Sequence, residues 1–293
     1  MLDNSLAMSD GTVTWRAMLA ETAQVVTDRT SALWLCQRAS GYDAEEFLKE
    51  MDALVTSRAA THLHDMIRRF LGGEPLQYVL GRWAFRRLDI MVDARVLIPR
   101  PETEMLVDHV LDEVTQRAGS TIVDLGTGSG AIGLAVLDEL PISHASVWMT
   151  DVSRDALDVA SANLAGLGRA GIGARLAHGS WFDALPDELA GTIDVVVANP
   201  PYVEDDDPDL ESRVREWEPP LALFGGADGL RDIATIVSGS SHWLRPGGLL
   251  LVEFGSRQGG AVHELAVSAG LSEVDILQDF AGLDRVLRAR VPH

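Results

Sequence analysis

From residue 121 onward, short β-branched runs alternate with segments of helical periodicity. This pattern predicts an open, mainly parallel sheet, because each parallel strand is reached through a crossover helix that covers a face of the sheet. Two closing runs around a turn at Gly282 predict a hairpin that places one antiparallel strand at the sheet edge. The predicted fold class is therefore α/β, a doubly wound sheet of seven strands. The expected strands lie at 121–126, 145–151, 174–179, 192–200 and 247–255, followed by SEVDILQD and LDRVLRARV.

A different pattern precedes this region. Over 13–71, apolar residues recur at spacings near three and four without a proline, which predicts a series of helices. Gly-Gly-Glu-Pro at 72–75 ends the series, since glycine weakens helix propensity and proline cannot extend the hydrogen-bond ladder. Over 78–98, the stretches YVLG, WAF, LDIMV and RVLIP are β-like and predict a linking hairpin. We therefore expect a helical domain at 12–74, a linker at 75–100 and a larger domain at 101–293.

The length of 293 residues fits two domains of about 150 residues each. No apolar run approaches the ~18 residues needed to cross a bilayer. The first residues lack the basic start, apolar centre and cleavage site of a signal peptide. The single cysteine, Cys36, cannot form an internal disulfide. We therefore expect a cytoplasmic protein without a membrane partner.

The charge is unevenly distributed. The formal net charge is −20, of which −16 falls on residues 111–293. Such an acidic region repels a phosphate backbone, so direct binding of nucleic acid is not expected. The region 68–100 is basic, and both a solvated surface and a docking surface for a macromolecular partner fit it. Its seven arginines are Arg68, Arg69, Arg82, Arg86, Arg87, Arg95 and Arg100.

A glycine-rich loop follows the first expected strand and opens a helix at Ala131. Glycines let a ligand approach the backbone closely, and the amides at a helix N-terminus suit an anionic group. The spacing fits the pyrophosphate of a dinucleotide as well as the carboxylate of a methionine moiety. Asp151 ends the next strand, where it can accept hydrogen bonds from both hydroxyls of a ribose or cap the helix near Ser153. The loop consists of Gly126, Thr127, Gly128, Ser129 and Gly130.

The fourth expected strand ends in Asn199-Pro200-Pro201-Tyr202, at the sheet edge where open α/β folds bind their ligands. The Asn199 side-chain oxygen and the Pro200 carbonyl can each accept one hydrogen of a planar NH2 group. The prolines stiffen the turn and remove competing donors, and Tyr202 offers a flat face to an amide. A simple turn also fits the tetrapeptide alone. Its place after a glycine loop and a ribose-position acid favours a site for an NH2 group.

Together, these motifs resemble the release factor glutamine methyltransferases, a family of class I S-adenosylmethionine-dependent methyltransferases. Asn-Pro-Pro-Tyr alone is shared with adenine and guanine amino methyltransferases, whereas Ile-Pro-Arg-Pro-Glu-Thr-Glu at 98–104 is far more specific. The resemblance covers most of the chain. It also includes Gly-Glu-Pro-Leu-Gln-Tyr at 73–78, Gly-Ser-Trp-Phe at 179–182, Glu218-Pro219 and Gly-Gly-Ala-Asp-Gly-Leu at 225–230.

The resemblance implies a Rossmann-like class I methyltransferase fold whose N-terminal helical domain docks the substrate. It implies that the loop 126–130 and Asp151 bind the methionine and ribose parts of S-adenosylmethionine, with Trp181 beside the adenine. The tetrapeptide at 199–202 would hold the target, with Asn199 next to the cofactor. The implied reaction methylates the side-chain amide nitrogen of the glutamine in the Gly-Gly-Gln motif of class-1 peptide chain release factors.

Two other functions share parts of this pattern. A nucleic-acid amino methyltransferase would use the same tetrapeptide but would need a basic groove, against which the acidic catalytic region argues. A non-catalytic cofactor-binding module is disfavoured by the intact acceptor site. Metal sites are not expected: His62 and His64 point to different faces of a helix, and Asp205, Asp206 and Asp207 fit a solvated acidic loop.

Overall fold

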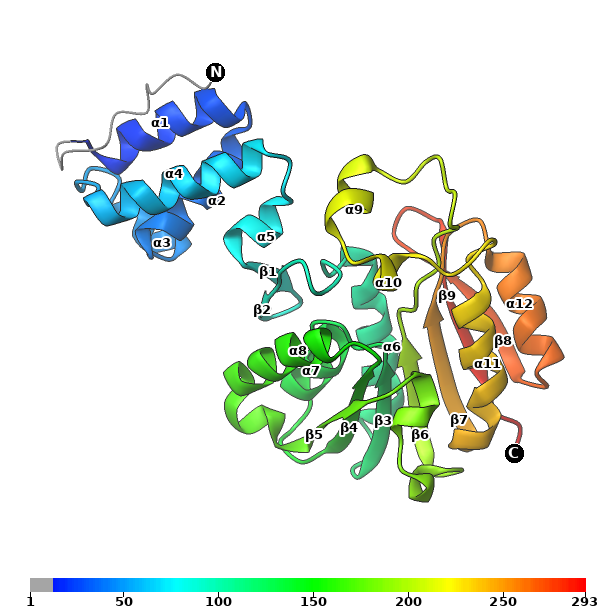
Figure 1. The fold of residues 1–293 in the computed structure, drawn as a ribbon. Helices are drawn as coiled ribbons and strands as arrows, with labels where there is room; N and C mark the ends of the chain where they lie inside the picture. The colour runs from blue at the N-terminus through cyan, green and yellow to red at the C-terminus, as the bar shows by residue number, and fades with distance from the viewer. Residues whose placement is uncertain (1–12) are drawn as a thin grey trace. The chain divides into compact units, whose positions relative to one another are not determined.

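The computed structural model describes residues 13–293 and divides into two compact units, with the boundary in the chain between Gly81 and Arg82 (Figure 1). The first unit is helical, which confirms the series of helices expected over 13–71. Polar side chains accept backbone hydrogen bonds at the starts of the first four helices, as N-caps do. The helices are α1 (Trp15–Val26), α2 (Arg29–Ser40), α3 (Ala44–Lys49), α4 (Ser57–Leu71) and α5 (Leu76–Leu80).

Helix α5 shows that the β-like interpretation of YVLG was wrong. Pro75 occupies the N-cap of this short helix, a position that requires no intrahelical N–H, and Gly81 ends it with a φ of 70°. Tyr78 and Val79 are buried. A run of four apolar residues is too short to distinguish a strand from one turn of buried helix.

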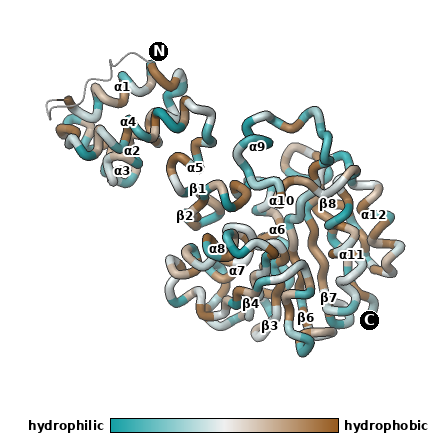
Figure 2. Tube along the Cα trace, in the orientation of Figure 1, coloured by the Kyte–Doolittle hydropathy of each residue, from teal (hydrophilic) through white to brown (hydrophobic). Residues whose placement is uncertain are grey.

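The second unit is built on a seven-stranded sheet with the order β5-β4-β3-β6-β7-β9-β8, so the predicted α/β fold class is confirmed. The central strand β6 is buried at every position, as both-sided coverage by helices requires. Figure 2 shows hydrophobic colouring along the central strands. The hairpin expected before the sheet is β1 (Arg82–Phe85) and β2 (Leu88–Met91), whereas RVLIP has no regular structure. The sheet strands are β3 (Ser120–Leu125), β4 (Ala145–Asp151), β5 (Ala174–His178), β6 (Ile193–Ala198), β7 (Leu244–Glu253), β8 (Ser272–Gln278) and β9 (Asp284–Arg290).

The antiparallel strand does not lie at the sheet edge, so that part of the prediction was wrong. Strand β9 pairs antiparallel with both β7 and β8, which makes β8 the edge strand. The connection through α12 (Gly259–Ser268) returns the chain to the sheet as β8, two positions beyond β7. The hairpin at Gly282 then brings β9 back into the space between them. Sequence alternation cannot reveal this, because either order of the two strands satisfies the same pattern.

Helices cover both faces of the sheet. Val123, Val196 and Leu250 belong to one core with residues of α11 and α12. Helix α6 contacts β6 and β7, and α7 contacts β3 and β4. Successive strand residues point to opposite faces, so each buried strand contributes to both cores. The helices of this unit include α6 (Glu104–Val114), α7 (Ala131–Glu139), α8 (Arg154–Leu167), α9 (Ser212–Trp217), α10 (Pro220–Leu223) and α11 (Arg231–Trp243), with the 3-10 turns η1 (Pro101–Thr103) and η3 (Trp181–Ala184).

Candidate functional site

A cavity of about 460 Å³ opens at the carboxyl edge of the parallel strands in the second unit. Leu125 at the end of β3 pairs with Thr150 of β4 and Ala198 of β6, so the residues after these strands emerge side by side. Most of the residues chosen from the sequence therefore meet there. Gly126, Thr127, Gly128, Ser129, Asp151, Trp181, Asn199 and Pro201 line the cavity, whereas Gly130, Pro200 and Tyr202 lie outside its lining.

The glycine loop turns sharply between β3 and α7. Gly126 and Gly130 have φ angles of 69° and 86°, in the left-handed region that favours glycine. A Cβ on Gly130 would lie 2.9 Å from side-chain atoms of both Leu134 and Met149. The loop is therefore seated directly on α7 and β4, and Ala131 at the start of α7 lines the cavity.

Asp151 presents its carboxylate to the cavity from the end of β4. Its two oxygens accept hydrogen bonds from the backbone amides of Gly128 at 2.9 Å and Ser153 at 2.8 Å. Each oxygen keeps a lone pair for a further donor. Ser153 caps α8 by accepting from the amide of Ala156, so Asp151 is not the helix cap. Burial raises the pKa of Asp151, although the backbone donors oppose that shift.

Trp181 follows β5 and packs onto the glycine loop. Its ring carbon Cζ3 lies 3.1 Å from the position that a Cβ on Gly126 would occupy. The φ of Trp181 is 46°, in the left-handed region that bulky residues rarely adopt. The local backbone is therefore held in an uncommon conformation that sets an aromatic wall beside the loop. Such a wall suits a planar ring of a ligand.

The corner at 199–202 is held from outside by close backbone packing. Gln258 Nε2 donates a hydrogen bond to the Tyr202 carbonyl at 3.0 Å. Gly225 and Gly229 approach the corner so closely that a Cβ on either would collide with its carbonyl oxygens. The Gly-Gly-Ala-Asp-Gly-Leu motif therefore supports the corner.

A buried polar network joins the corner to Thr103, which also lines the cavity, and to Glu253. Asn199 Nδ2 donates to Thr103 Oγ1 at 3.1 Å, and the Thr103 hydroxyl donates to Glu253 Oε2 at 2.7 Å. The Tyr202 hydroxyl donates to the other Glu253 oxygen at 3.3 Å. Neither Thr103 nor Glu253 was predicted from the sequence as a site residue. The available signal was one acidic residue at the end of the apolar run GGLLLV.

A second buried acid joins two other motifs beside the cavity. Glu218 is only 3% exposed, accepts a hydrogen bond from the Ile98 amide at 3.2 Å and pairs with the Arg100 guanidinium. This contact ties the 98–104 segment to the Glu218-Pro219 motif. Pro99 and Pro219, next to these partners, both line the cavity. The motifs that make the family resemblance specific therefore fold together around one site.

Asp124 lies beneath the glycine loop with one carboxyl oxygen unsatisfied among the described residues. Oδ2 accepts from the Thr127 hydroxyl at 2.6 Å and the Gly133 amide at 3.0 Å, and Oδ1 has no partner there. Burial raises the pKa of Asp124 to about 6. Because the folded pKa exceeds that of the unfolded chain, protonation stabilises the fold at low pH. That contribution is lost as the pH rises through 6.

As the pH rises from 5 to 7, we expect deprotonation of Asp124 to lower the unfolding free energy of the wild-type protein by about 1 kcal/mol. The variant Asp124→Asn keeps an oxygen for Thr127 and Gly133 without a titrating charge, so it should lose less stability over this interval. Urea unfolding at both pH values measures the difference. Equal losses in the two proteins would show that Asp124 titrates normally.

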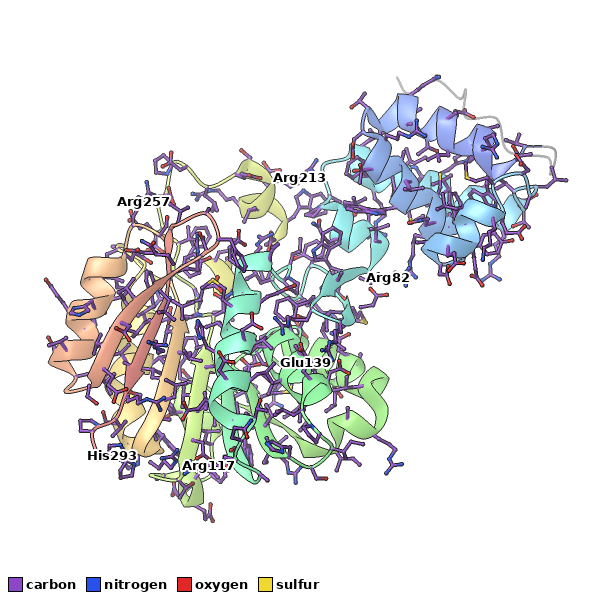
Figure 3. All side chains as sticks on the ribbon, turned by 180° about the vertical axis from the view of Figure 1, so that it is seen from behind. Arg82, Arg117, Glu139, Arg213, Arg257 and His293 are labelled. Atoms are coloured by element: carbon purple, nitrogen blue, oxygen red, sulfur yellow. The ribbon has the colours of Figure 1, made fainter. Side chains whose placement is uncertain are left out.

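Each of the seven arginines of region 68–100 is paired with an acidic side chain. Arg86 contacts Asp108 and Glu139, and Glu139, labelled in Figure 3, also lies 3.8 Å from Arg87. These pairs favour an ordinary ion-paired surface over a free basic docking patch. The other pairs are Arg68–Asp65, Arg69–Glu74, Arg82–Asp89, Arg95–Asp93 and Arg100–Glu218.

The acidic loop after the corner is partly neutralised. Arg257, labelled in Figure 3, pairs with Asp207 at 3.5 Å and Asp209 at 3.0 Å. Within residues 13–293, no group of three or more His, Cys, Asp or Glu side chains is placed to hold a metal ion. No helix in the same part of the chain is both long and apolar enough to cross a membrane.

Comparison with known proteins gives matches over most of the chain. Residues 14–81 match the PrmC N-terminal domain, and residues 101–214 match the Methyltransferase small domain. The release factor glutamine methyltransferase of Xylella fastidiosa (strain 9a5c) is 37% identical over 90% of this chain and 94% of its own length. The protein of that name from Neisseria gonorrhoeae is 39% identical, covering 88% and 92%. A methyltransferase from Pyrococcus furiosus has a similar fold, with a TM-score of 0.53 at 19% identity over 78% of this chain and 99% of that structure.

Proposed function

The chain belongs to the release factor glutamine methyltransferase family, and on this basis we propose that it methylates the glutamine of the Gly-Gly-Gln motif in class-1 peptide chain release factors. It is an S-adenosylmethionine-dependent methyltransferase. One observation most directly supports an NH2 group as the group that is methylated. The NH2 group of Asn199 donates a hydrogen bond to Thr103, so the Asn199 oxygen is left to accept one from a donor in the cavity.

The residues of the cavity fit S-adenosylmethionine. We propose that the Asp151 carboxylate accepts hydrogen bonds from the ribose hydroxyls with its remaining lone pairs. The glycines of the loop 126–130 would let the methionine part of the cofactor approach the backbone. Trp181 would lie beside the adenine, and Asn199 would lie beside the methyl group that is transferred. When bound, the cofactor supplies an electrophilic methyl group on a sulfonium.

We assign the substrate glutamine to the corner at 199–202. The Asn199 oxygen and the Pro200 carbonyl would each accept one hydrogen of its NH2 group. Pro200 and Pro201 bring no N–H that could compete for these acceptors. Tyr202 lies outside the cavity lining and bonds Glu253, which favours a supporting role over stacking on the substrate amide.

Positioning contributes more to this reaction than activation of the nitrogen. An amide lone pair is delocalised, a resonance whose scale is the ~18 to 20 kcal/mol barrier to peptide-bond rotation. Two neutral hydrogen bonds, each worth roughly 0.5 to 1.5 kcal/mol, cannot remove it. In-line placement of the reactants contributes up to ~7 to 11 kcal/mol. The corner therefore acts mainly by orienting the nitrogen, and water can take the proton as methyl transfers.

We further propose that the helical domain at 12–74 docks the release factor, with 75–100 as the linker and 101–293 as the catalytic domain. The formal charge of −16 over residues 111–293 supports a protein rather than a nucleic acid as the substrate. We place the reaction in the cytoplasm, where release factors act, without a membrane partner.

Labelled S-adenosylmethionine incubated with a release factor, with ribosomal protein or with nucleic acid tests this function. We expect label in the release factor, and mass spectrometry should locate one methyl group on the glutamine of the Gly-Gly-Gln motif. A release factor with asparagine at that position is the matched control and should stay unlabelled. Label in nucleic acid alone would favour a nucleic-acid amino methyltransferase. Cofactor binding without any transfer would favour a non-catalytic module.

A further inference from the structure

Four side chains from separate parts of the second unit form one chain of hydrogen bonds. Thr103 ends η1, Asn199 and Tyr202 follow β6, and Glu253 ends β7. The donors run from Asn199 to Thr103 at 3.1 Å, from Thr103 to Glu253 at 2.7 Å and from Tyr202 to Glu253 at 3.3 Å. Thr103 is 4% exposed and Glu253 1%. Water therefore competes little for these bonds.

The number of hydrogens in this network determines how the Asn199 amide is oriented. An ionised carboxylate only accepts hydrogen bonds, and a hydroxyl has a single hydrogen to donate. Thr103 gives its hydrogen to Glu253, so its oxygen can only accept from the next partner. That partner must be the NH2 half of the Asn199 amide. The oxygen half is then directed away from Thr103.

We propose that Thr103 and Glu253 are positioning residues that hold the Asn199 carboxamide with its oxygen toward the substrate. This inference rests on the proposed function, because it concerns the NH2 group of the glutamine that Asn199 would hold. A substrate NH2 group needs an acceptor at this point. An inverted Asn199 would turn its own NH2 group toward the NH2 group of the substrate, and neither of these two donors could accept a hydrogen bond from the other.

Protonation of Glu253 would reverse the direction of the network. A neutral carboxyl group can donate to Thr103, which then donates to the Asn199 oxygen and turns the NH2 group toward the cavity. Burial raises the pKa of Glu253 to about 7. The charged and titratable groups that act on it are Tyr202 after β6, Glu102 in η1 and Arg285 at the start of β9. Methyl transfer should therefore require the carboxylate and rise with pH through about 7.

The variants Thr103→Val and Thr103→Ser test this proposal in single-turnover reactions at saturating cofactor and release factor, between pH 6 and pH 9. Valine has nearly the shape of threonine but no hydroxyl, so methyl transfer should fall about tenfold and lose its rise near pH 7. Serine keeps the hydroxyl, so Thr103→Ser should have a rate within about threefold of the wild type and should keep the rise near pH 7. Thr115→Val, at the other end of α6, should behave as the wild type. Cofactor affinity and unfolding midpoints check that the variants are folded.

The outcomes separate this inference from the proposed function. A Thr103→Val variant with the wild-type rate and pH dependence would overturn the positioning role, as would a Thr103→Ser variant as slow as the valine variant. Glu253→Gln, which cannot ionise, should show no rise near pH 7, and a persistent rise in that variant would also count against the role. A wild-type protein that leaves release factors unmethylated would overturn both proposals.

Discussion

Replacing Asn199 with alanine should lower the rate of methyl transfer more than a hundredfold, about 2.7 kcal/mol of barrier. Alanine removes the side-chain oxygen that would accept a hydrogen from the substrate amide, and the nitrogen then loses its in-line orientation. Cofactor affinity should stay within about tenfold, since Asp151 and the glycine loop are untouched. Single-turnover kinetics at saturating release factor measure the rate, and equilibrium titration measures the affinity.

Asp206→Ala is the matched control for this variant. Asp206 is exposed in the acidic loop just beyond the corner, so its loss should leave the rate near that of the wild type. Near-normal methyl transfer by Asn199→Ala would refute the hydrogen-bonding role of Asn199. A large drop in both variants would instead indicate that the whole loop must be intact for substrate binding.

Replacing Asp151 with alanine should weaken cofactor binding about a hundredfold. Hydrogen bonds to a charged group are worth roughly 1.5 to 3 kcal/mol, and the variant loses those proposed to the ribose. It also frees the amides of Gly128 and Ser153, which Asp151 now holds. The loop between β3 and α7 should become less ordered as a result. Calorimetric titration with S-adenosylhomocysteine, which has no methyl group to transfer, measures the affinity.

Asp158→Ala provides the comparison for Asp151→Ala. Asp158 is an exposed residue of α8, so this variant removes one negative charge near the cavity without touching the glycine loop. We expect an affinity close to that of the wild type. An unchanged affinity in Asp151→Ala would exclude the ribose contact. Equal weakening in both variants would point to long-range charge rather than to a specific hydrogen bond.

Local patterns in the sequence predicted most of the second unit. Strand β6 is apolar except for Asp194 and is followed by Asn199 and a proline pair, and the loop at 126–130 combines glycines with the start of a helix. Both patterns consist of residues that are close together in the sequence, so they can be recognised without the tertiary structure. The order of such strands along one edge was enough to predict that Asp151 and Asn199 would lie near the glycine loop, and all three line one cavity.

Other features had no local signal. Thr103 and Glu253 are 150 residues apart, and nothing adjacent to either indicates that they share a hydrogen bond. The region 68–100 is basic in sequence, but partners such as Asp108 and Glu139 neutralise Arg86 only in the folded chain. The hydrogen bond from the Tyr202 hydroxyl to the buried Glu253 likewise joins two segments that are distant in the sequence.

The amino-acid order alone therefore determined which segments become strands of the seven-stranded sheet, where the chain turns between them, and which backbone amides and acceptors are available at the sheet edge. Those properties follow from side-chain periodicity, from the fixed φ angle of proline and from the wide φ range of glycine. Tertiary structure alone decided the position of β9, the pairing of Arg86, Arg87 and Arg100, and the orientation of the Asn199 amide. Each of these depends on which distant groups come within hydrogen-bond distance, and only the packing of the two helical layers on the sheet sets that distance.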